Sequence, residues 1–141
     1  MHYRHKLITG LAVFCVGALL GGAVHAGFKS FVSVSVKAGK KPPYVAKGDL
    51  GLAYGSNQPE ETIGCTITAT AAALSAECMA MSGEGVLAKC TTSDPNLISA
   101  LHALNGDSHL EFQWEPTDKT KPGVGTCTSI VVGNSSSTKP K

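Results

Sequence analysis

Segments in which apolar and polar residues alternate recur along this chain. Successive side chains of a strand point to opposite faces, so a period of two predicts a strand with one buried face. The segments that show this period are 28–37, 62–67, 86–90, 110–114 and 126–132. Stretches rich in proline, glycine or polar residues separate them and predict turns, at 38–43, 55–61, 82–85 and 116–125. A further short strand fits within 44–53.

One segment has the helical period instead. An apolar stripe at helical spacing runs along it, formed by Leu97, Ile98, Leu101 and Leu104. Asp94 and Pro95 predict its start, because an aspartate accepts hydrogen bonds from the first backbone N–H groups and proline suits the first helical position. Asn105 and Gly106 predict its end, since both tolerate the left-handed conformation of a helix cap.

The alanine-rich segment 69–81 fits two structures. Alanine and leucine favour a helix there. Threonines at 62, 66, 68 and 70 and the turn residues at 82–85 favour two neighbouring strands, joined by a turn near 72–75. With the second interpretation, the chain is an α+β protein. We predict a small, mostly antiparallel β-sheet with one packed α-helix, braced by two disulfides.

The first 26 residues have the three parts of a cleavable signal peptide. A basic start precedes an apolar run from 7 to 23, and Val24-His25-Ala26 provides small residues before the cleavage site. An uncleaved membrane anchor is the alternative, although about 17 apolar residues is at the lower limit for a bilayer span. Phe14 before Cys15 argues against lipid attachment. The predicted divisions are a signal peptide (1–26), an N-terminal strand and linker (27–47), a disulfide-braced α+β domain (48–133) and a polar tail (134–141).

Cleavage at this site changes the charge of the protein. Arg4 is the only arginine in the chain, and ten lysines then balance ten acidic residues. Nucleic-acid binding needs a surplus of positive charge, so this class of function is disfavoured. The one basic cluster, formed by Lys37, Lys40, Lys41 and Lys47, suits contact with anionic lipid or polysaccharide, solubility, or protection of an edge strand.

Four cysteines follow the signal segment: Cys65, Cys78, Cys90 and Cys127. An even number in a small exported protein predicts two disulfides. A zinc site is the alternative, but its cysteines usually come in close pairs, and here the nearest two are Cys78 and Cys90. Four cysteines allow three connectivities. The strand pattern favours Cys65–Cys78, facing each other across a hairpin, with Cys90–Cys127 as the second bridge.

Candidates for chemistry are few. The histidines that remain after cleavage are His102, on the predicted helix, and His109, on the polar face of the following strand near Glu111. With Asp107 or Glu111 they would make a metal site or an acid–base pair, but no motif of the HExxH type supports this. A GxSxG nucleophile motif is absent as well. We therefore assign no catalytic residue, metal ligand or cofactor, and treat His102, His109 and Glu111 as surface candidates only.

Several short motifs occur in a recognisable order. They are Gly48-Asp49-Leu50, Ile63-Gly64-Cys65, Cys90-Thr91-Thr92, Asp107-Ser108 before the strand at 110–114, and Gly125-Thr126-Cys127-Thr128. This order resembles a group of small secreted bacterial proteins of uncharacterised function, with a signal peptide, a central IGC and a C-terminal GTCT-like segment. The resemblance implies export, bacterial origin and a disulfide between the later cysteines. The chain departs from that group at Tyr54 and at Pro59-Glu60, where an arginine and an aspartate are expected.

The sequence therefore predicts an exported, non-enzymatic bacterial protein that is periplasmic or secreted and acts as a binding or structural module. An inhibitor or immunity-type protein that blocks a hydrolase is the alternative, because small disulfide-braced domains suit rigid interfaces. A small hydrolase is a third possibility. The expected partner is a protein or an envelope glycan, and we expect neither nucleic-acid binding nor a stable membrane anchor after cleavage.

Overall fold

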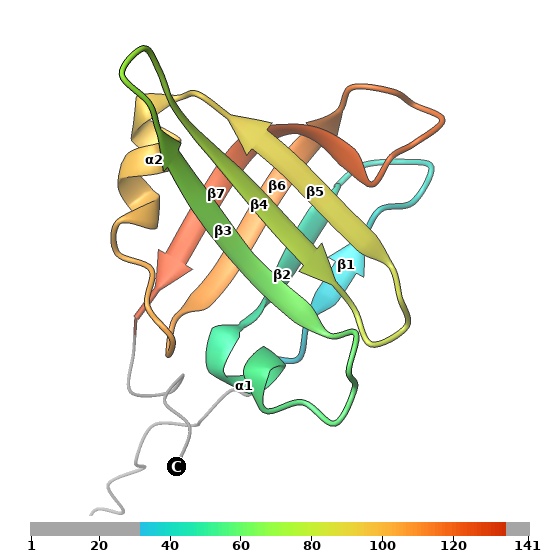
Figure 1. Cartoon of the computed structure of the whole chain (residues 1–141). Coiled ribbons are helices and arrows are strands. Elements are labelled where there is room, and N and C mark those ends of the chain that lie inside the picture. Colours follow the sequence, from blue (N-terminus) through green and yellow to red (C-terminus); the bar gives the residue numbers. More distant parts are fainter. Residues whose placement is uncertain (1–31, 135–141) are drawn as a thin grey trace, which may run out of the picture.

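The computed structural model describes residues 32–134, which form one seven-stranded sheet with two helices (Figure 1). The strands are β1 (Ser35–Lys37), β2 (Val45–Asp49), β3 (Thr62–Ala69), β4 (Leu74–Met81), β5 (Leu87–Thr92), β6 (His109–Pro116) and β7 (Val124–Gly133). The helices are α1 (Leu50–Tyr54) and α2 (Pro95–Leu101).

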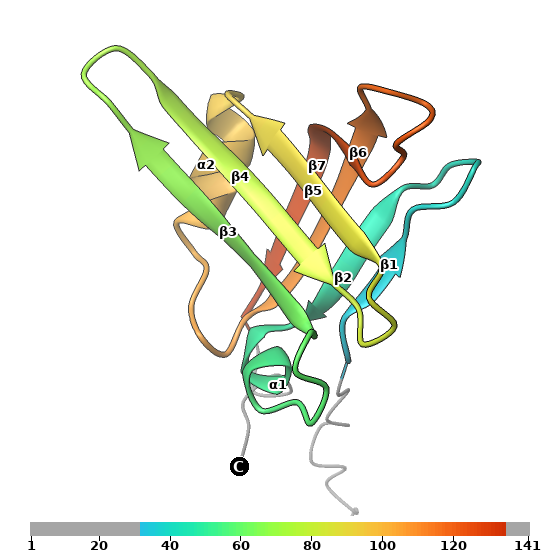
Figure 2. The same cartoon turned by 45° about the vertical axis from the view of Figure 1, so that its right-hand side comes forward.

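The strand order is β1-β2-β6-β7-β5-β4-β3, so β1 and β3 are the two edges of the sheet. Every neighbouring pair is antiparallel except β5 and β7, which are parallel. The sheet bends there into two layers, β3-β4-β5 in front and β1-β2-β6-β7 behind (Figure 1). The β3–β4 hairpin extends beyond the rest of the fold (Figure 2).

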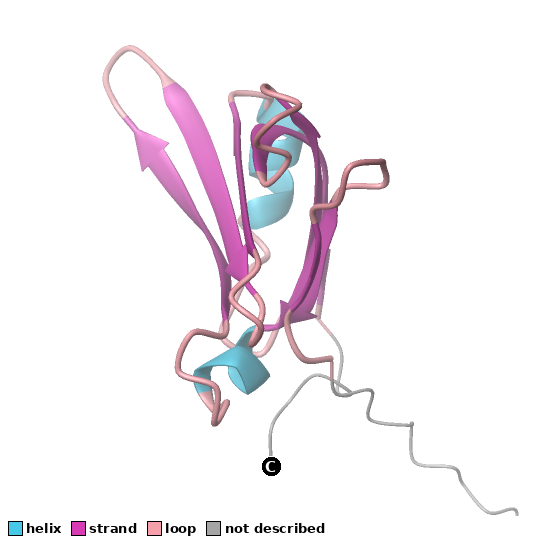
Figure 3. Ribbon diagram, turned by 90° about the vertical axis from the view of Figure 1, so that its right-hand side faces the viewer, coloured by secondary structure: helices cyan, strands magenta, loops and turns pink. Residues whose placement is uncertain are grey.

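The helices fill the space that the bent sheet leaves open. In the side view, α2 lies between the two layers and α1 lies across one end of them (Figure 3). Helix α2 contacts β7, β3 and β4, while α1 contacts β3 and β2. A sheet that buries one face against itself and against a helix needs apolar side chains on that face only. The alternating pattern along the strands provides this arrangement.

The core lies between the two layers. Alternate residues of each strand point into it, and Phe112 and Trp114 of β6 are its largest members (0% and 3% exposed). The other core residues are Val34, Ala46, Ile63, Ala76, Cys78, Ala80, Ala88, Cys90, Ile98, Leu101, Leu110, Cys127 and Ile130. The Trp114 indole N–H donates a hydrogen bond to the Pro122 carbonyl oxygen at 2.7 Å. This bond satisfies the only polar atom of the Trp114 side chain inside the core.

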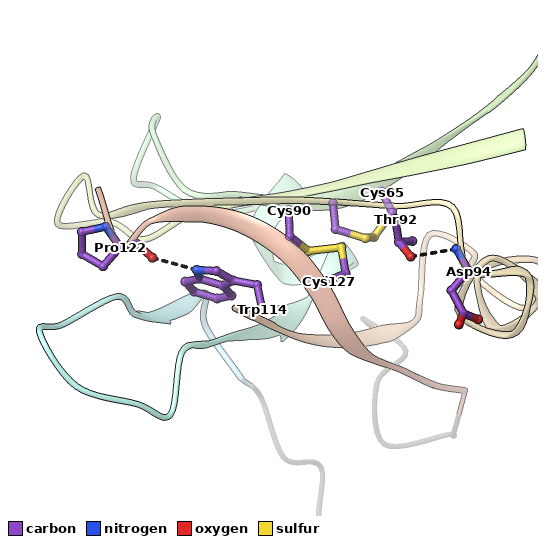
Figure 4. The surroundings of a disulfide bond; sticks show 8 residues. Cys65, Cys90, Thr92, Asp94, Trp114, Pro122 and Cys127 are labelled. Atoms are coloured by element: carbon purple, nitrogen blue, oxygen red, sulfur yellow. Dashed lines mark hydrogen bonds between the residues drawn. A yellow bond between two sulfur atoms is a disulfide. The ribbon is translucent and has the colours of Figure 1, made fainter. Parts of the chain in front are cut away.

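Both disulfides link neighbouring strands beside this core (Figure 4). Cys65 bonds to Cys78, its direct partner across β3 and β4, and Cys90 bonds to Cys127 between the parallel strands β5 and β7. Cys78 is also opposite Cys90 in the register of β4 and β5. Cys65, Cys78 and Cys90 therefore form a row across β3, β4 and β5, and the second bridge connects this row to β7. Gly125 stands opposite Cys90 in the same row, where any Cβ would be 2.0 Å from the Glu115 carbonyl oxygen.

The predicted fold class is right in its coarse features and wrong in its detail. The protein is mostly β-sheet with two disulfide-bonded cysteine pairs, as expected. The sheet is large and mixed rather than small and antiparallel, and it carries two helices rather than one. Period-two patterns predict strands but not their order, so the parallel β5–β7 pair was not foreseen. Helix α1 has five residues and no side-chain cap, which leaves no helical signal in its sequence.

Local predictions can be compared element by element. The alanine-rich segment forms two strands, and its turn lies at Thr70–Ala73, slightly before the predicted position. The helix start is confirmed: the Asp94 carboxylate accepts hydrogen bonds from the N–H groups of Asn96 and Leu97. Helix α2 ends at Leu101, about a turn earlier than predicted, because hydrogen bonds from Ser108 and Asn134 hold the segment that follows it.

Some predictions concern residues beyond the described range. The signal peptide lies outside it, as does the polar tail after Asn134. Within residues 32–134, no helix has the length and apolar character needed to cross a membrane.

Candidate functional site

A largely apolar cleft with a volume of about 510 Å³ lies beside α1. We call it the α1 cleft. Helix α1, the start of β3 and the loop between α2 and β6 form its walls, with the lining residues Leu50, Gly51, Ala53, Tyr54, Glu61, Thr62, Ile63, Gly106 and Asp107. Two segments close in the sequence, 50–54 and 61–63, therefore meet a distant one, 106–107, at this place.

The start of α1 is anchored to β6 through the Asp49 carboxylate, which is 1% exposed. Its Oδ1 lies 2.6 Å from Nδ1 of His109, and its Oδ2 accepts a hydrogen bond from the Val32 N–H at 3.1 Å. The Leu50 N–H donates to the Ser108 carbonyl oxygen at 3.0 Å. Because Asp49 makes these distant contacts, its side chain does not cap the helix it precedes. These bonds hold the α1 wall of the cleft against the sheet.

The opposite wall is held by a buried serine. Ser108 is 0% exposed, and its hydroxyl accepts a hydrogen bond from the Asn105 N–H at 2.8 Å and donates one to the Asn134 side chain. The Asn134 amide donates to the Ala103 carbonyl oxygen at 2.8 Å. These contacts turn the chain after Leu101 and explain why α2 ends there. They also leave the Gly106–Asp107 segment in a defined position.

A carboxylate closes the third side of the cleft. Glu61 precedes β3, and its side chain accepts hydrogen bonds from the Val34 N–H and the Ser56 hydroxyl. It thereby joins the two edge regions of the sheet at this end. Glu61 also borders a second cleft of about 420 Å³, on the side of residues 33–36. The cleft walls are therefore tied together by hydrogen bonds before any partner binds, which lowers the entropy cost of binding.

The accessible groups of the α1 cleft are one aromatic ring, an apolar floor and a carboxylate. Tyr54 is 97% exposed at the end of α1, and Ile63 and Leu50 form part of the floor. Asp107 has no ion-pair partner among residues 32–134. A cationic or amphipathic side chain fits this combination, because an aromatic face and a carboxylate both attract a cation.

The structure does not combine the three residues chosen from the sequence into one hydrogen-bonded site. His102 is exposed at the C-terminal end of α2. His109 lies at the start of β6, but its partner is Asp49 and not Asp107 or Glu111. Glu111 accepts a hydrogen bond from the Gln113 side chain at 3.3 Å. The sequence did not point to Asp49, because the two partners are 60 residues apart and meet only through the pairing of β2 with β6.

The Asp49–His109 pair has one feature of an acid–base site, a buried carboxylate that orients an imidazole. Such a site also needs a nucleophile or a substrate group at the other ring nitrogen. In the described residues, no hydroxyl or thiol hydrogen-bonds to Nε2 of His109, and the nearby Ser108 hydroxyl is used by Asn105 and Asn134. The Asp49–His109 contact links β2 to β6.

No group of three or more potential metal ligands occurs between residues 32 and 134. Tyr54 and Asp107, the accessible groups of the α1 cleft, were not selected from the sequence as site residues. In the sequence, Tyr54 was noted only as a departure from the resembling group, and Asp107 only as a possible partner of the histidines and as part of the Asp107-Ser108 motif.

Comparisons with known proteins add nothing to this geometry: no protein-family model, no curated protein and no solved structure matches the chain.

Proposed function

We propose that this protein is an exported, non-enzymatic binding module that holds a partner protein at the α1 cleft. The observation that carries the proposal is Tyr54, an aromatic side chain that is 97% exposed beside an apolar cleft. Tyrosine is among the residues most often responsible for binding energy at protein interfaces. An exposed tyrosine at the mouth of a cleft suits contact with a partner much better than a role in the core.

The chemistry of the cleft favours a protein over a glycan. Sugar recognition needs many hydrogen-bonding groups, whereas Leu50, Ala53 and Ile63 give this cleft a largely apolar lining. Its carboxylates, from Asp107 and Glu61, suit a lysine or arginine of the partner, whose aliphatic stem would lie on the apolar floor. We therefore expect the partner to insert a basic side chain beside Tyr54.

Export is part of the proposal and rests on two features. The first 26 residues read as a signal peptide, and the two disulfides suit an oxidising compartment such as the periplasm or the exterior of the cell. The absence of catalysis is also a proposal, supported by the Asp49–His109 pair, whose oriented imidazole has no hydroxyl or thiol partner in the described chain.

An inhibitor of an exported hydrolase is the second candidate, and the anchoring of the cleft favours it. Hydrogen bonds from Asp49, Ser108 and Glu61 hold all three walls, and the disulfides brace the sheet behind them. Tight protease inhibitors share this preorganised character, because a rigid surface loses little entropy on binding. An inhibitor would bind one enzyme stably and lower its activity, which a simple adaptor would not do.

The test is capture of partners from envelope and culture-medium extracts, with cross-linking and mass spectrometry, using the oxidised full chain as bait. The Tyr54→Ala variant should bind the captured protein about tenfold or more weakly. Val124→Ala is the matched control: Val124 is 43% exposed and lies at the end of β7 remote from His109. Asp107→Asn should weaken binding as well. Added salt should reduce the difference in affinity between this variant and the unaltered protein, because salt screens the attraction between Asp107 and a cation.

Three results would contradict the proposal. One is capture that Tyr54→Ala and Val124→Ala reduce equally, and another is binding of glycan only. The third is a hydrolytic activity that His109→Ala abolishes while the variant remains folded.

A further inference from the structure

The two edges of the sheet are protected very differently. An exposed edge strand presents unpaired backbone groups to other chains, and proteins usually blunt it with lysines, prolines or a short strand. Strand β1 has all three: it is three residues long, contains Lys37, and is followed by Lys40, Lys41 and two prolines. Strand β3 has none. It is eight residues long, and the whole segment from Thr62 to Ala76 contains no charged residue and no proline.

The geometry of the Cys65–Cys78 bridge shows which backbone groups of β3 face outward. The Cα atoms of this directly opposed pair are 4.0 Å apart, the short spacing of a pair that exchanges no backbone hydrogen bonds. The N–H and C=O groups of Cys65 therefore point away from β4. By the alternation of an antiparallel ladder, those of Ile67 and Ala69 do so too. In the described part of the chain, no strand pairs with this outer side of β3.

The distal half of β3 is the accessible part of this edge. Helix α1 contacts β3, and the cleft places it beside Thr62 and Ile63 at the start of the strand. Further along, Thr66, Thr68 and Ala69 are exposed, and the hairpin extends past the rest of the fold (Figures 2 and 3). The turn is closed by hydrogen bonds between Thr70 and Ala73. The bridge at Cys65 and Cys78 braces its base, so the edge is rigid as well as open.

We propose that this distal edge of β3 pairs, antiparallel, with the same edge of a second copy of the chain, which joins the two sheets into one. A two-fold axis at Ile67 brings the outward groups into register: Ile67 meets Ile67, and Cys65 meets Ala69 of the other copy. Thr66 then stands opposite Thr68 of the other copy, twice. Threonine pairs on one face of an antiparallel ladder are favourable, and the contact closes without leaving an open edge at either β3.

A second copy fits this edge better than an unrelated strand does. A two-fold contact brings a segment against its own copy, so a segment that carries a net charge of one sign repels itself and an uncharged segment does not. The run from Thr62 to Ala76 is uncharged, and the nearest charge on β4, Glu77, is paired with Lys89 of β5 at 2.9 Å. An unrelated partner strand would gain specificity from charges on the edge, and none is present.

The test is sedimentation equilibrium of the oxidised full chain over a range of protein concentrations. The Thr66→Lys/Thr68→Lys variant places lysine opposite lysine twice in the dimer, and its dimer Kd should rise about tenfold or more. Thr91→Lys/Thr126→Lys is the matched control. These threonines are exposed neighbours across β5 and β7, so the same charge is added at the centre of the sheet, away from the edge.

Hydrogen exchange gives a second readout that needs no variant. The amides of Cys65, Ile67 and Ala69 should become protected as the protein concentration rises, while those of Thr66 and Thr68, bonded to β4, should not change. A protein that stays monomeric up to millimolar concentration overturns the proposal. So does a dimer that the edge lysines weaken no more than the control does. Tyr54→Ala should leave the dimer intact, so failure of the proposed function and failure of this pairing are distinguishable.

Discussion

The two disulfides should contribute unequally to stability, because they close loops of different length. The bridge between Cys90 and Cys127 spans a sequence separation of 37 residues, and that between Cys65 and Cys78 spans 13. The loss of chain entropy on cross-linking the unfolded state grows with the logarithm of loop length. It predicts a stabilisation of about 4 kcal/mol for the longer loop and about 3 kcal/mol for the shorter one.

The perturbation is to replace each pair by alanine in a separate double variant. Both variants lose two sulfur atoms, so the terms for lost contacts and residual voids nearly cancel in the comparison. They do not cancel fully, because Cys90 and Cys127 are both buried whereas Cys65 is only half-buried. This residual term has the same sign as the loop-length term. The Cys90→Ala/Cys127→Ala variant should therefore be the less stable of the two, by about 1 kcal/mol or somewhat more.

Guanidinium titration followed by Trp114 fluorescence measures both losses. The slope of the transition must be fitted separately for each protein, because removing a cross-link expands the unfolded state. A difference of 1 kcal/mol corresponds to a shift in Tm of about 5 °C for a domain of this size, so calorimetry provides an independent check. An equal loss in the two variants, or a larger loss without Cys65–Cys78, would refute the assignment of these contributions to loop entropy.

Three further predictions follow from single positions. Gly125→Ala places a Cβ 2.0 Å from a backbone oxygen of β6 and should lower the free energy of unfolding by about 3 kcal/mol or more. Gly106→Ala is the control, because no atom lies within 4 Å of the new Cβ, and it should be close to neutral. Equal free energies of unfolding for the two variants would contradict the close packing of β6 and β7. Asp49→Ala should lower the free energy of unfolding by about 3 kcal/mol, because it removes a buried carboxylate that accepts two hydrogen bonds. Chemical denaturation measures this loss. A change below about 1 kcal/mol would show that these bonds are not stabilising. Hydrogen bonds from the Thr120 hydroxyl and from the Thr120 backbone N–H hold the pKa of Asp118 below its ordinary value. The stabilisation that these bonds provide is therefore present above the ordinary pKa, and it is lost as the pH falls through the lowered pKa. Thr120→Ala should raise that pKa toward the ordinary value in an NMR titration, and an unchanged midpoint would contradict the assignment.

Features that depend on neighbouring residues were visible in the sequence. Period-two alternation located β5, β6 and β7, since the side chains of a strand alternate whatever the strand pairs with. The start of α2 at Pro95 was equally clear, because Asp94 caps the first turn with its own side chain. Cysteine number indicated two disulfides, and the hairpin pattern favoured the Cys65–Cys78 bridge that the structure contains.

Features that depend on strand order were decided only by the tertiary structure. The parallel pairing of β5 with β7 brings Cys90 and Cys127 together and bends the sheet. The pairing of β2 with β6 buries Asp49 against His109. His109 therefore contacts Asp49, and not Asp107 or Glu111, which the sequence had suggested as its partners. The α1 cleft and the open edge of β3 arise in the same way. The cleft joins segments far apart in the chain, and the edge is open because no strand in the described residues pairs with the outer side of β3. A local pattern carries no information about which distant segment it will meet, because that choice depends on the burial of the whole apolar face at once.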